Sequence, residues 1–402
     1  MNRNKLNFTY GTCVTIEVVI ASVIAILTAL GQHSIISLLF SLSFIVAFLF
    51  VALKVFEQNK VNISIVLAVL CVINVTLNGL QEYGRMNFDY YKKVIMFCCF
   101  MFLVYYSIQE TEEVPAWFLQ IIEILPVVAG SFLVFSYYYM GNTEEIAEGI
   151  TLGFANPNFT GMWLLHFFLY GALFVLKAFK GGSKLRLLYI PVLLIIYNLI
   201  PETGARSCQI GALAFFAFVL LKPLMTRSPS LFAVCVAIFP FLFAIFYLTF
   251  VDQPWVQDTF SFMTSEGKSL TSRVRIWTRA FNGFAEHPIF GNYSGISRGA
   301  GQAQMHNTHI DVLASYGILG FVLFIKILFD RLKQSSKAVT SFYQTSAFCA
   351  FCAVIVSGTF EAAMVSGAMG LNLLTVGLLL LAQNEASKAT SQKGIRVVWK
   401  KL

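Results

Sequence analysis

The stretch LFAVCVAIFPFLFAIFYLTF, Leu231–Phe250, contains twenty residues and no charged side chain. A helix rises about 1.5 Å per residue, so such a stretch covers the roughly 30 Å of a bilayer's hydrocarbon core. The stretch SLLFSLSFIVAFLFVAL, Ser37–Leu53, has the same character. Lipid offers no hydrogen-bond partner to an open backbone, so both stretches are predicted to cross a membrane as helices.

The composition of the whole chain supports a membrane protein. Of its 402 residues, 57% are hydrophobic and 12% are charged, whereas a soluble domain carries about a quarter charged residues. A polytopic membrane protein is the class that fits. The net charge of +8 is compatible with a nucleic-acid partner, but the basic residues lie between apolar runs, which indicates membrane topology instead. No nucleic acid is expected as a partner.

The cysteines and the first apolar run need separate explanations. All eight cysteines lie in or beside apolar runs and are expected to behave as small hydrophobic residues. The CAFC stretch, Cys349–Cys352, has redox or zinc spacing but no second ligand pair nearby, so neither role is predicted.

The first apolar run follows MNRNK and has no clear small-residue cleavage pattern, which indicates a retained first helix.

Apolar runs separated by polar breaks predict an all-α bundle of about twelve membrane helices in a single domain, residues 1–402. The predicted spans are 12–31, 34–53, 61–80, 91–108, 117–140, 158–178, 187–200, 206–222, 231–251, 309–328, 341–358 and 366–383. An even number of spans places both termini on the same side of the membrane.

Lysine and arginine residues divide unevenly between the two predicted faces. Nineteen of the 28 fall on the face that carries both termini, and the positive-inside rule makes that face cytoplasmic. Five of the other nine lie in one connection, residues 252–308, the longest in the chain. Loops beyond about 15 residues are usually functional or disordered. This one contains aromatic residues and a helical period, so we expect an extracytoplasmic loop that folds over the outer mouth of the bundle.

The loop contains an amphipathic pattern over Ser272–His287. At about 100° per residue, Arg273 shares one face with Trp277 and several other apolar residues, whereas Arg275 and Arg279 point the opposite way. A buried arginine requires a counter-charge. Two partners are open: an acid of the same loop in a structural ion pair, or a phosphate-type anion, which suits the planar guanidinium.

Two further outer positions are candidates. Arg206, in PETGARSCQIGALAFF, begins a predicted helix after a turn; it either extends to the membrane surface or faces the same anion from the opposite wall. His306 stands just before another helix, which Asn307 or Thr308 can cap. A neutral imidazole there can act as a general base near pH 7. No HExxH motif or nearby cysteine pair accompanies it, so a zinc site is not predicted.

Four segments in the second half of the chain carry a family resemblance. They are GFANPNFTGMWL from Gly153, TGARSCQIGALAFF from Thr203, SRVRIWTRAFNGFAEHPIFGNYSGI from Ser272 and MHNTHIDVLASYGILGF from Met305. In order and spacing they resemble segments of the O-antigen ligase and polysaccharide polymerase superfamily of bacterial membrane glycosyltransferases. Two residues beside Arg206 depart from the superfamily pattern: Ala205 stands where serine is usual, and Ser207 where glycine is usual. The connection 252–308, although the longest in this chain, is at the short end for the superfamily.

The resemblance implies a polytopic, GT-C-like enzyme of the bacterial plasma membrane with an extracytoplasmic active site. Such an enzyme takes a glycan from undecaprenyl diphosphate at the outer leaflet and joins it to a hydroxyl of a glycan or lipid-linked acceptor. Arg206 and Arg273 would stabilise the charge that develops on the departing diphosphate. His306 would remove or orient the acceptor's proton, with Asn307 fixing its geometry.

Two more residues are assigned to substrate, and no cofactor is expected. Glu361, in the predicted outer turn GTFEAAMVSG, would pair with an arginine or contact sugar. Asn158 would bind sugar, although the start of a helix is the simpler account of its position. Because preorganised arginines can replace a metal in stabilising the leaving group, a metal-independent reaction is expected.

Several functions remain open at this point. A polymerase of lipid-linked repeat units is favoured over a ligase that moves the glycan to lipid A core, a wall polymer or a protein. A secondary transporter or lipid-linked glycan flippase is the alternative from another class. It predicts repeated halves and ionisable residues at mid-membrane depth, which the sequence lacks. A non-catalytic scaffold would leave a buried Arg273 unexplained.

Overall fold

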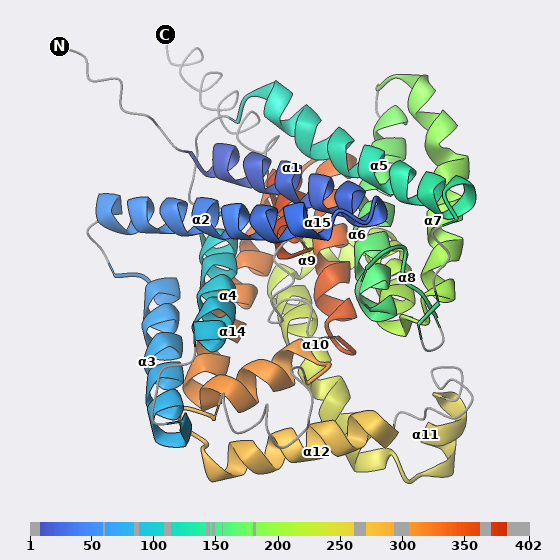
Figure 1. The fold of residues 1–402 in the computed structure, drawn as a ribbon. Coiled ribbons are helices and arrows are strands. Elements are labelled where there is room, and N and C mark those ends of the chain that lie inside the picture. Colours follow the sequence, from blue (N-terminus) through green and yellow to red (C-terminus); the bar gives the residue numbers. More distant parts are fainter. Residues whose placement is uncertain are drawn as a thin grey trace, which may run out of the picture.

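The computed structural model describes most of the chain, and the described part is almost entirely helical (Figure 1). The described residues are 9–58, 61–83, 88–107, 114–141, 145–146, 149–154, 156–179, 182–260, 271–292, 305–361 and 371–383. Among them the only strands are β1 (Glu145–Ile146) and β2 (Gly149–Ile150), an antiparallel pair in which Glu145 lies opposite Ile150. The predicted all-α class is confirmed.

The helices of the described chain are joined by mostly short connections. In chain order they are α1 (Tyr10–Ala29), α2 (His33–Gln58), α3 (Ile63–Tyr83), α4 (Phe88–Tyr106), α5 (Ala116–Tyr139), α6 (Pro157–Ala178), the 3-10 helix η1 (Lys184–Tyr189), α7 (Ile190–Glu202), α8 (Arg206–Leu220), α9 (Lys222–Arg227), α10 (Pro229–Phe250), α11 (Pro254–Thr259), α12 (Thr271–Glu286), α14 (Thr308–Ala338) and α15 (Phe342–Ser357). A further apolar helix spans Leu371–Gln383.

The lengths of these helices support a polytopic membrane protein. Seven helices among the described residues are long and apolar enough to cross a membrane, and five shorter apolar helices of 10–17 residues accompany them. The number of twelve crossings stays a prediction. Of the predicted loop 252–308, the structure describes α11, α12 and their flanks; residues 261–270 and 293–304 lie outside the described ranges.

One predicted helix end is wrong. α14 continues to Ala338, whereas its predicted span ends at residue 328. Its last turns still have an inner side to bury: Leu332 and Ser335 are completely buried. The hydroxyl of Ser336 also donates a hydrogen bond to the carbonyl oxygen of Met225 at 2.8 Å. The helix therefore persists through a basic stretch that interrupts the hydropathy signal.

Local sequence determines where several helices begin. Asn156 caps α6 by accepting a hydrogen bond from the backbone N–H of Asn158, and Pro157 occupies the first turn, where its missing N–H is not needed. Ser341 caps α15 in a capping box with Gln344. Both helices begin within a residue of their predicted starts.

The helices that carry the candidate site pack against one another in pairs. α10 packs along α14, and α8 packs along α15. A β-carbon on Gly211 of α8 would lie only 3.0 Å from the β-carbon of Ser357 and 2.8 Å from Cδ2 of Leu165 in α6. A small residue thus lets three helices approach closely, as in other membrane bundles. The beginning of α8 consequently lies beside the end of α15.

α14 is broken by a glycine. Gly317 has φ 64° and ψ −168°, values that residues with a side chain rarely adopt. The turn after α12 fills the break: the N–H of Ile318 donates to the carbonyl oxygen of Pro288 at 2.9 Å, and the N–H of Asn292 donates to that of Ala314 at 3.0 Å. The first piece of α14 is thereby held by the segment that follows α12.

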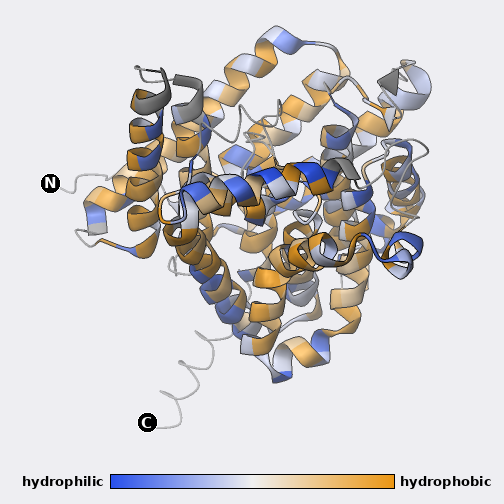
Figure 2. Cartoon of the chain, turned by 90° about the horizontal axis from the view of Figure 1, so that it is seen from below, coloured by the Kyte–Doolittle hydropathy of each residue, from blue (hydrophilic) through white to orange (hydrophobic). Residues whose placement is uncertain are grey.

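α12 lies across one end of the helix bundle, at the bottom of Figure 1. Figure 2 views the molecule from below, and there α12 lies in front with hydrophilic and hydrophobic residues interleaved along it. A small separate core, which includes Trp277, Tyr247, Met305 and Phe360, joins its inner side to the bundle. Burial of these side chains fixes α12 over this end.

Candidate functional site

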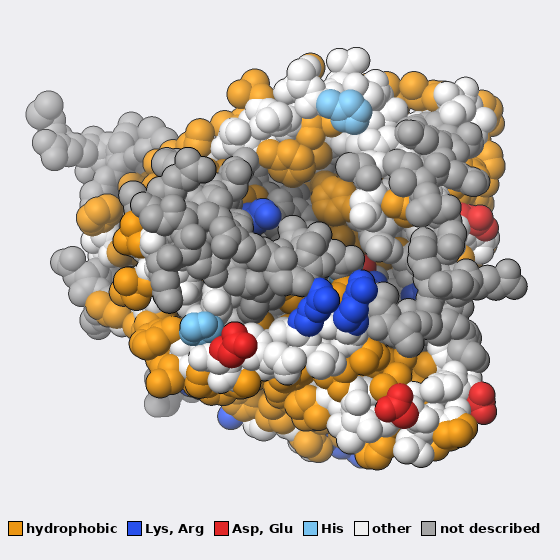
Figure 3. All heavy atoms as spheres, turned by 60° about the horizontal axis from the view of Figure 1, so that its bottom comes forward, with side chains coloured by type: hydrophobic (Ala, Val, Ile, Leu, Met, Phe, Trp, Pro, Cys, Tyr) orange, Lys and Arg blue, Asp and Glu red, His pale blue; other side chains and the backbone are white. Residues whose placement is uncertain are grey.

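α12 presents its charged residues on two sides, as the amphipathic pattern predicts. Trp277 and Ala280 are completely buried, whereas Arg275 and Arg279 are exposed. The side chain of Arg273 lies toward the buried side and is 20% exposed, so a ligand can still reach it. Figure 3 brings this end of the molecule forward and shows cationic side chains standing on it.

Trp277 fixes α12 beside His306. Its indole N–H donates to the carbonyl oxygen of Met305 at 3.0 Å. The same ring meets Tyr247 of α10 edge to face, with ring centroids 6.2 Å apart. Because a buried indole N–H needs a partner, this bond holds Met305, and with it His306, in a fixed position relative to α12.

Glu361 joins Arg273 and His306 into one group, which we call the ionic triad. Its Oε1 lies 3.3 Å from Nη2 of Arg273, and its Oε2 lies 3.1 Å from Nδ1 of His306. The carboxylate is 4% exposed, so water screens both interactions weakly. Thr308 holds the backbone here: its hydroxyl donates to the carbonyl oxygen of Glu361 at 3.2 Å and its N–H to that of Gly358 at 2.9 Å.

The ionic triad corrects one expectation about Arg273. The described acid partner of this arginine does not belong to its own loop but comes from the turn after α15. Glu361 pairs with an arginine, which is one of the two roles predicted for it. Its contact with His306 was missed, because the only signal in the sequence is an acid in a turn predicted to lie on the same face.

The carboxylate determines which nitrogen of His306 carries the proton. Burial alone raises the pKa of Glu361, but the hydrogen bond from His306 and the positive charge of Arg273 outweigh it and hold the pKa below the ordinary value of 4.5. An ionised carboxylate only accepts hydrogen bonds, so Nδ1 of the imidazole must be the donor. In the neutral ring Nε2 then carries a free electron pair, which is the state a general base needs.

His306 also has an unusual backbone. Its φ is 49°, in the left-handed region that few residues with a side chain adopt. Such conformations cost about 1–3 kcal/mol and persist only where the surroundings enforce them, often at active sites. Here the tie of Met305 to Trp277 on one side and the capping residue Asn307 on the other enforce it.

Asn307 is wholly occupied within the protein. Its Oδ1 accepts from the backbone N–H groups of His309 and Ile310 at 2.9 and 3.0 Å, which caps α14. Its Nδ2 donates to the carbonyl oxygens of Pro240 and Thr359 at 3.0 and 2.9 Å. These bonds use both hydrogens and both lone pairs of the amide. The arrangement favours the predicted role of fixing the geometry of His306 and leaves no group for a sugar.

The turn of α10 that contains Pro240 receives contacts from α14. Pro240 has no N–H, so the hydrogen-bond ladder of α10 is interrupted in this turn. Nε2 of His309 hydrogen-bonds the carbonyl oxygen of Ala237 at 2.7 Å, in the same turn. His309 is completely buried and serves to anchor α14 on α10.

Arg206 lies at the same end of the bundle as the ionic triad. It is the first residue of α8 and is half-buried. The close contact of Gly211 with Ser357 places this part of α8 beside the end of α15, four residues before Glu361. Joint binding of one anion by Arg206 and Arg273 stays a prediction.

Asn158 also comes to this end. It lies in the first turn of α6, where its N–H is used by the cap Asn156. A β-carbon on Gly161, one turn further, would lie 2.3 Å from the β-carbon of Ala205, directly before α8. The beginnings of α6 and α8 are therefore adjacent, and a contact of the Asn158 side chain with sugar stays a prediction.

Comparison with known proteins gives a match to one protein family. Residues 190–325 match the family described as O-Antigen ligase. This match supports the resemblance of the chain to the O-antigen ligase and polysaccharide polymerase superfamily. The matched residues contain Arg206, Arg273 and His306, whereas Asn158 and Glu361 lie outside them. No curated protein and no solved structure matches the chain.

The described residues do not bring metal ligands together. Within the ranges given above, no three side chains of His, Cys, Asp or Glu are grouped as they would be around a metal ion. Seven of the eight cysteines are buried, and Cys235 is exposed on α10.

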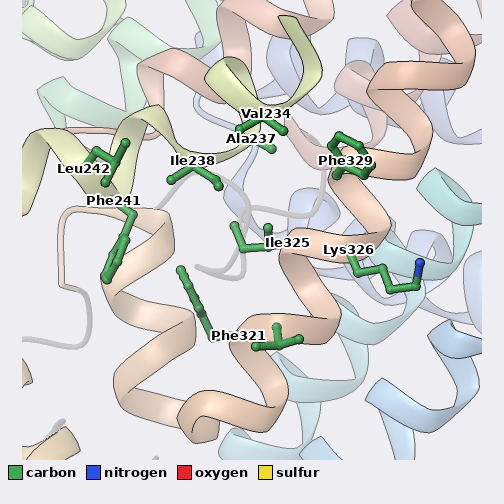
Figure 4. Close-up of a pocket in the computed structure, with 10 residues that line it drawn as sticks. Val234, Ala237, Ile238, Phe241, Leu242, Phe321, Ile325, Lys326 and Phe329 are labelled. Atoms are coloured by element: carbon green, nitrogen blue, oxygen red, sulfur yellow. The ribbon is translucent and has the colours of Figure 1, made fainter. Parts of the chain in front are cut away.

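An apolar groove lies between α10 and α14, close to the site (Figure 4). Its volume is about 560 Å³. It is lined by Val234, Ala237, Ile238, Phe241 and Leu242 of α10 and by Phe321, Val322, Ile325, Lys326 and Phe329 of α14. Phe241 also faces Phe281 of α12, with ring centroids 6.3 Å apart. One lining residue of the groove therefore contacts α12.

Proposed function

We propose that the protein transfers a glycan from undecaprenyl diphosphate to an acceptor hydroxyl at the outer face of the membrane and so extends a polysaccharide chain. The observation that carries this proposal is the ionic triad, in which a cation and a base are held by one buried carboxylate. The match to the O-antigen ligase family supports the class of reaction. Lipid-linked glycans are the substrates that this class implies.

The residues of the site fit the two charges that such a transfer develops. The acceptor oxygen forms a bond to the anomeric carbon while the bond from that carbon to the diphosphate oxygen breaks, and the electron pair stays on the diphosphate. Arg273, aided by Arg206, stabilises this negative charge. Nε2 of His306 takes the proton of the acceptor hydroxyl. The side chains of Arg273 and His306 are partly accessible to a ligand, at 20% and 21% exposure.

The groove between α10 and α14 supports a lipid-linked donor. A polyprenyl chain is apolar throughout and needs a surface that lipid or protein can cover. The groove is apolar apart from Lys326, and its lining residue Phe241 contacts Phe281 of α12. A chain lying in it would present its diphosphate end toward α12, where Arg273 is located.

A ligase is the second candidate, because the matching family carries that name. The two activities differ in the acceptor alone. A polymerase joins the glycan to another lipid-linked repeat unit, and a ligase joins it to lipid A core, a wall polymer or a protein. The same catalytic group serves both, so the acceptor must be identified from the product.

The test uses purified protein in liposomes with an undecaprenyl diphosphate-linked oligosaccharide, with and without EDTA. We expect release of undecaprenyl diphosphate and formation of longer glycan in both conditions. Arg206→Ala and Arg273→Ala should lower kcat about 10²–10³-fold, as removal of one charge-stabilising donor does elsewhere. His306→Ala should lower it about 10²–10⁴-fold.

Arg275→Ala is the matched control, because Arg275 is an exposed arginine of the same helix. It should retain the activity of the wild type. Normal turnover by the three site variants would refute the site assignment. Movement of the lipid-linked glycan across the liposome without a new glycosidic bond would refute the enzyme proposal in favour of a flippase.

A further inference from the structure

We infer that Glu361 is shared between Arg273 and His306, and that a bound diphosphate takes over Arg273 and leaves Glu361 to strengthen His306 as a base. The inference rests on the proposed function, because it concerns the same reaction. In it Glu361 is a positioning residue: it acts through the two groups that touch substrate. Arrival of the donor would thereby activate the base that deprotonates the acceptor.

The accessibility of the three side chains supports this division of roles. Arg273 and His306 are 20% and 21% exposed, whereas the carboxylate of Glu361 is 4% exposed. A guanidinium carries five N–H donors, and the described bond to Glu361 uses one, on Nη2. The other donors suit the oxygens of a diphosphate, which carries more charge than one carboxylate.

The distances indicate that the contact with Arg273 can be exchanged. Charge-assisted hydrogen bonds are usually about 2.7–2.9 Å long. The contact of Glu361 with Arg273 is 3.3 Å, longer than its contact of 3.1 Å with His306. The weaker of the two bonds of this carboxylate is therefore the one that a phosphate would replace.

Exchange alters the proton affinity of His306. While Arg273 neutralises part of the charge of Glu361, the carboxylate attracts the imidazolium form less strongly. When phosphate oxygens satisfy Arg273, the whole charge of Glu361 acts on His306 and favours its protonated form. The acceptor proton then moves to Nε2 while the Nδ1 proton stays in its bond to Glu361. After transfer, Nε2 releases its proton to water and Arg273 returns to Glu361.

The variants below leave the other charged groups around His306 in place. Asp311 of α14 is within electrostatic reach of His306, and Lys93 of α4 is within reach of Asp311. His309 is buried against α10, and Arg206 begins α8 at the same end. Their effects are common to all variants below, so differences between variants report on Arg273 and Glu361.

The test measures the protonation of His306 without turnover. Diethyl pyrocarbonate acylates neutral imidazole, and peptide mass spectrometry reads the extent at His306 between pH 5 and 8. Relative to the wild type, we expect the midpoint of this pH dependence to fall by about one pH unit in Glu361→Gln. It should rise in Arg273→Gln, which leaves the carboxylate to His306 alone. Arg275→Gln, on the exposed side of α12, should match the wild type.

A second arm adds inorganic pyrophosphate to the same full-length proteins. The midpoint of the wild type should move toward that of Arg273→Gln, whereas the midpoint of Glu361→Gln should move less, because only the charge of the bound anion itself acts there. Glu361→Asp, which keeps the charge on a shorter side chain, should lie between wild type and Glu361→Gln and guards against misfolding of the latter.

The outcomes separate this inference from the proposed function. Equal midpoints in wild type, Glu361→Gln and Arg273→Gln, or shifts in the same direction for both variants, would overturn the inference even if the enzyme turns over lipid-linked glycan. Opposite shifts, together with a larger response to pyrophosphate in the wild type than in Glu361→Gln, would support it. Absence of glycan transfer by the wild type would instead refute the proposed function, whatever the midpoints.

Discussion

Asn307 shows how much one residue does for the position of His306. It caps α14 and at the same time bonds Pro240 of α10 and Thr359 of the turn after α15. Asn307→Asp keeps the cap acceptor but removes both donors, and leaves two buried carbonyl oxygens without them. We expect this variant to lose about 2 kcal/mol of stability and at least about tenfold in kcat. Thermal unfolding in detergent and the transfer assay check this, and an unchanged kcat would contradict it.

Glu361 makes the stability of the protein depend on pH in a defined window. Its pKa in the folded protein is lowered below 4.5. Its ionic bonds therefore stabilise the fold fully above about pH 4.5, and this contribution is lost as the pH falls through the lower folded pKa.

The thermal midpoint of wild type minus that of Glu361→Gln should thus be largest above pH 5, corresponding to about 2 kcal/mol, and shrink toward pH 3.5. Glu286→Gln removes an exposed carboxylate of α12 and serves as the control. A difference that is constant over this range would show that the carboxylate contributes no charge-dependent stability.

At the scale of elements, the broken helix α14 depends on Gly317. A β-carbon there would lie 2.3 Å from the carbonyl oxygen of Ile289, in the turn that fills the break. Gly317→Ala combines this clash with an unfavourable φ, and we expect a loss of at least about 3 kcal/mol. Gly31→Ala is the control: φ is +70° there too, but no atom lies within 4 Å of the added carbon. It should cost about 1–2 kcal/mol. Equal unfolding midpoints would argue against the clamp.

The groove between α10 and α14 predicts a change in substrate affinity. Val322 lines it and is 53% exposed, so Val322→Trp fills the groove without disturbing the core. If a polyprenyl chain lies there, KM for the lipid-linked donor should rise about tenfold while kcat changes less than about twofold. Leu213→Trp, on an exposed position of α8, is the control. An unchanged KM would place the chain elsewhere.

At the scale of the whole molecule, α6 separates two ends of different character. Its beginning adjoins α8 near the ionic triad, and its 22 residues span about 33 Å. At its other end Lys177 and Arg186 both pair with the buried Glu123 of α5. These two basic residues belong to the face that is predicted to be cytoplasmic.

Labelling tests that orientation. In a Cys235→Ser background, where the remaining cysteines are buried, Arg275→Cys should react with a membrane-impermeant maleimide in intact cells. Lys337→Cys, exposed at the end of α14, should react only after permeabilisation. The background protein without either new cysteine is the control. The reverse pattern would place the ionic triad inside the cell and exclude transfer at the outer leaflet.

The amino-acid sequence determined the class of the protein, the positions of most described helices, the buried side of α12 and the two residues, Asn307 or Thr308, that can cap α14. Each depends on hydropathy, helical period or capping within a few neighbouring residues, so a linear pattern contains it. Only the tertiary structure decided that Glu361 meets Arg273, 88 residues away, and His306, 55 residues away. It also decided that Asn307 bonds α10 and that the turn after α12 fills the break in α14. Electrostatic and packing interactions act between groups that are close in space, and separation along the chain does not specify which groups those are.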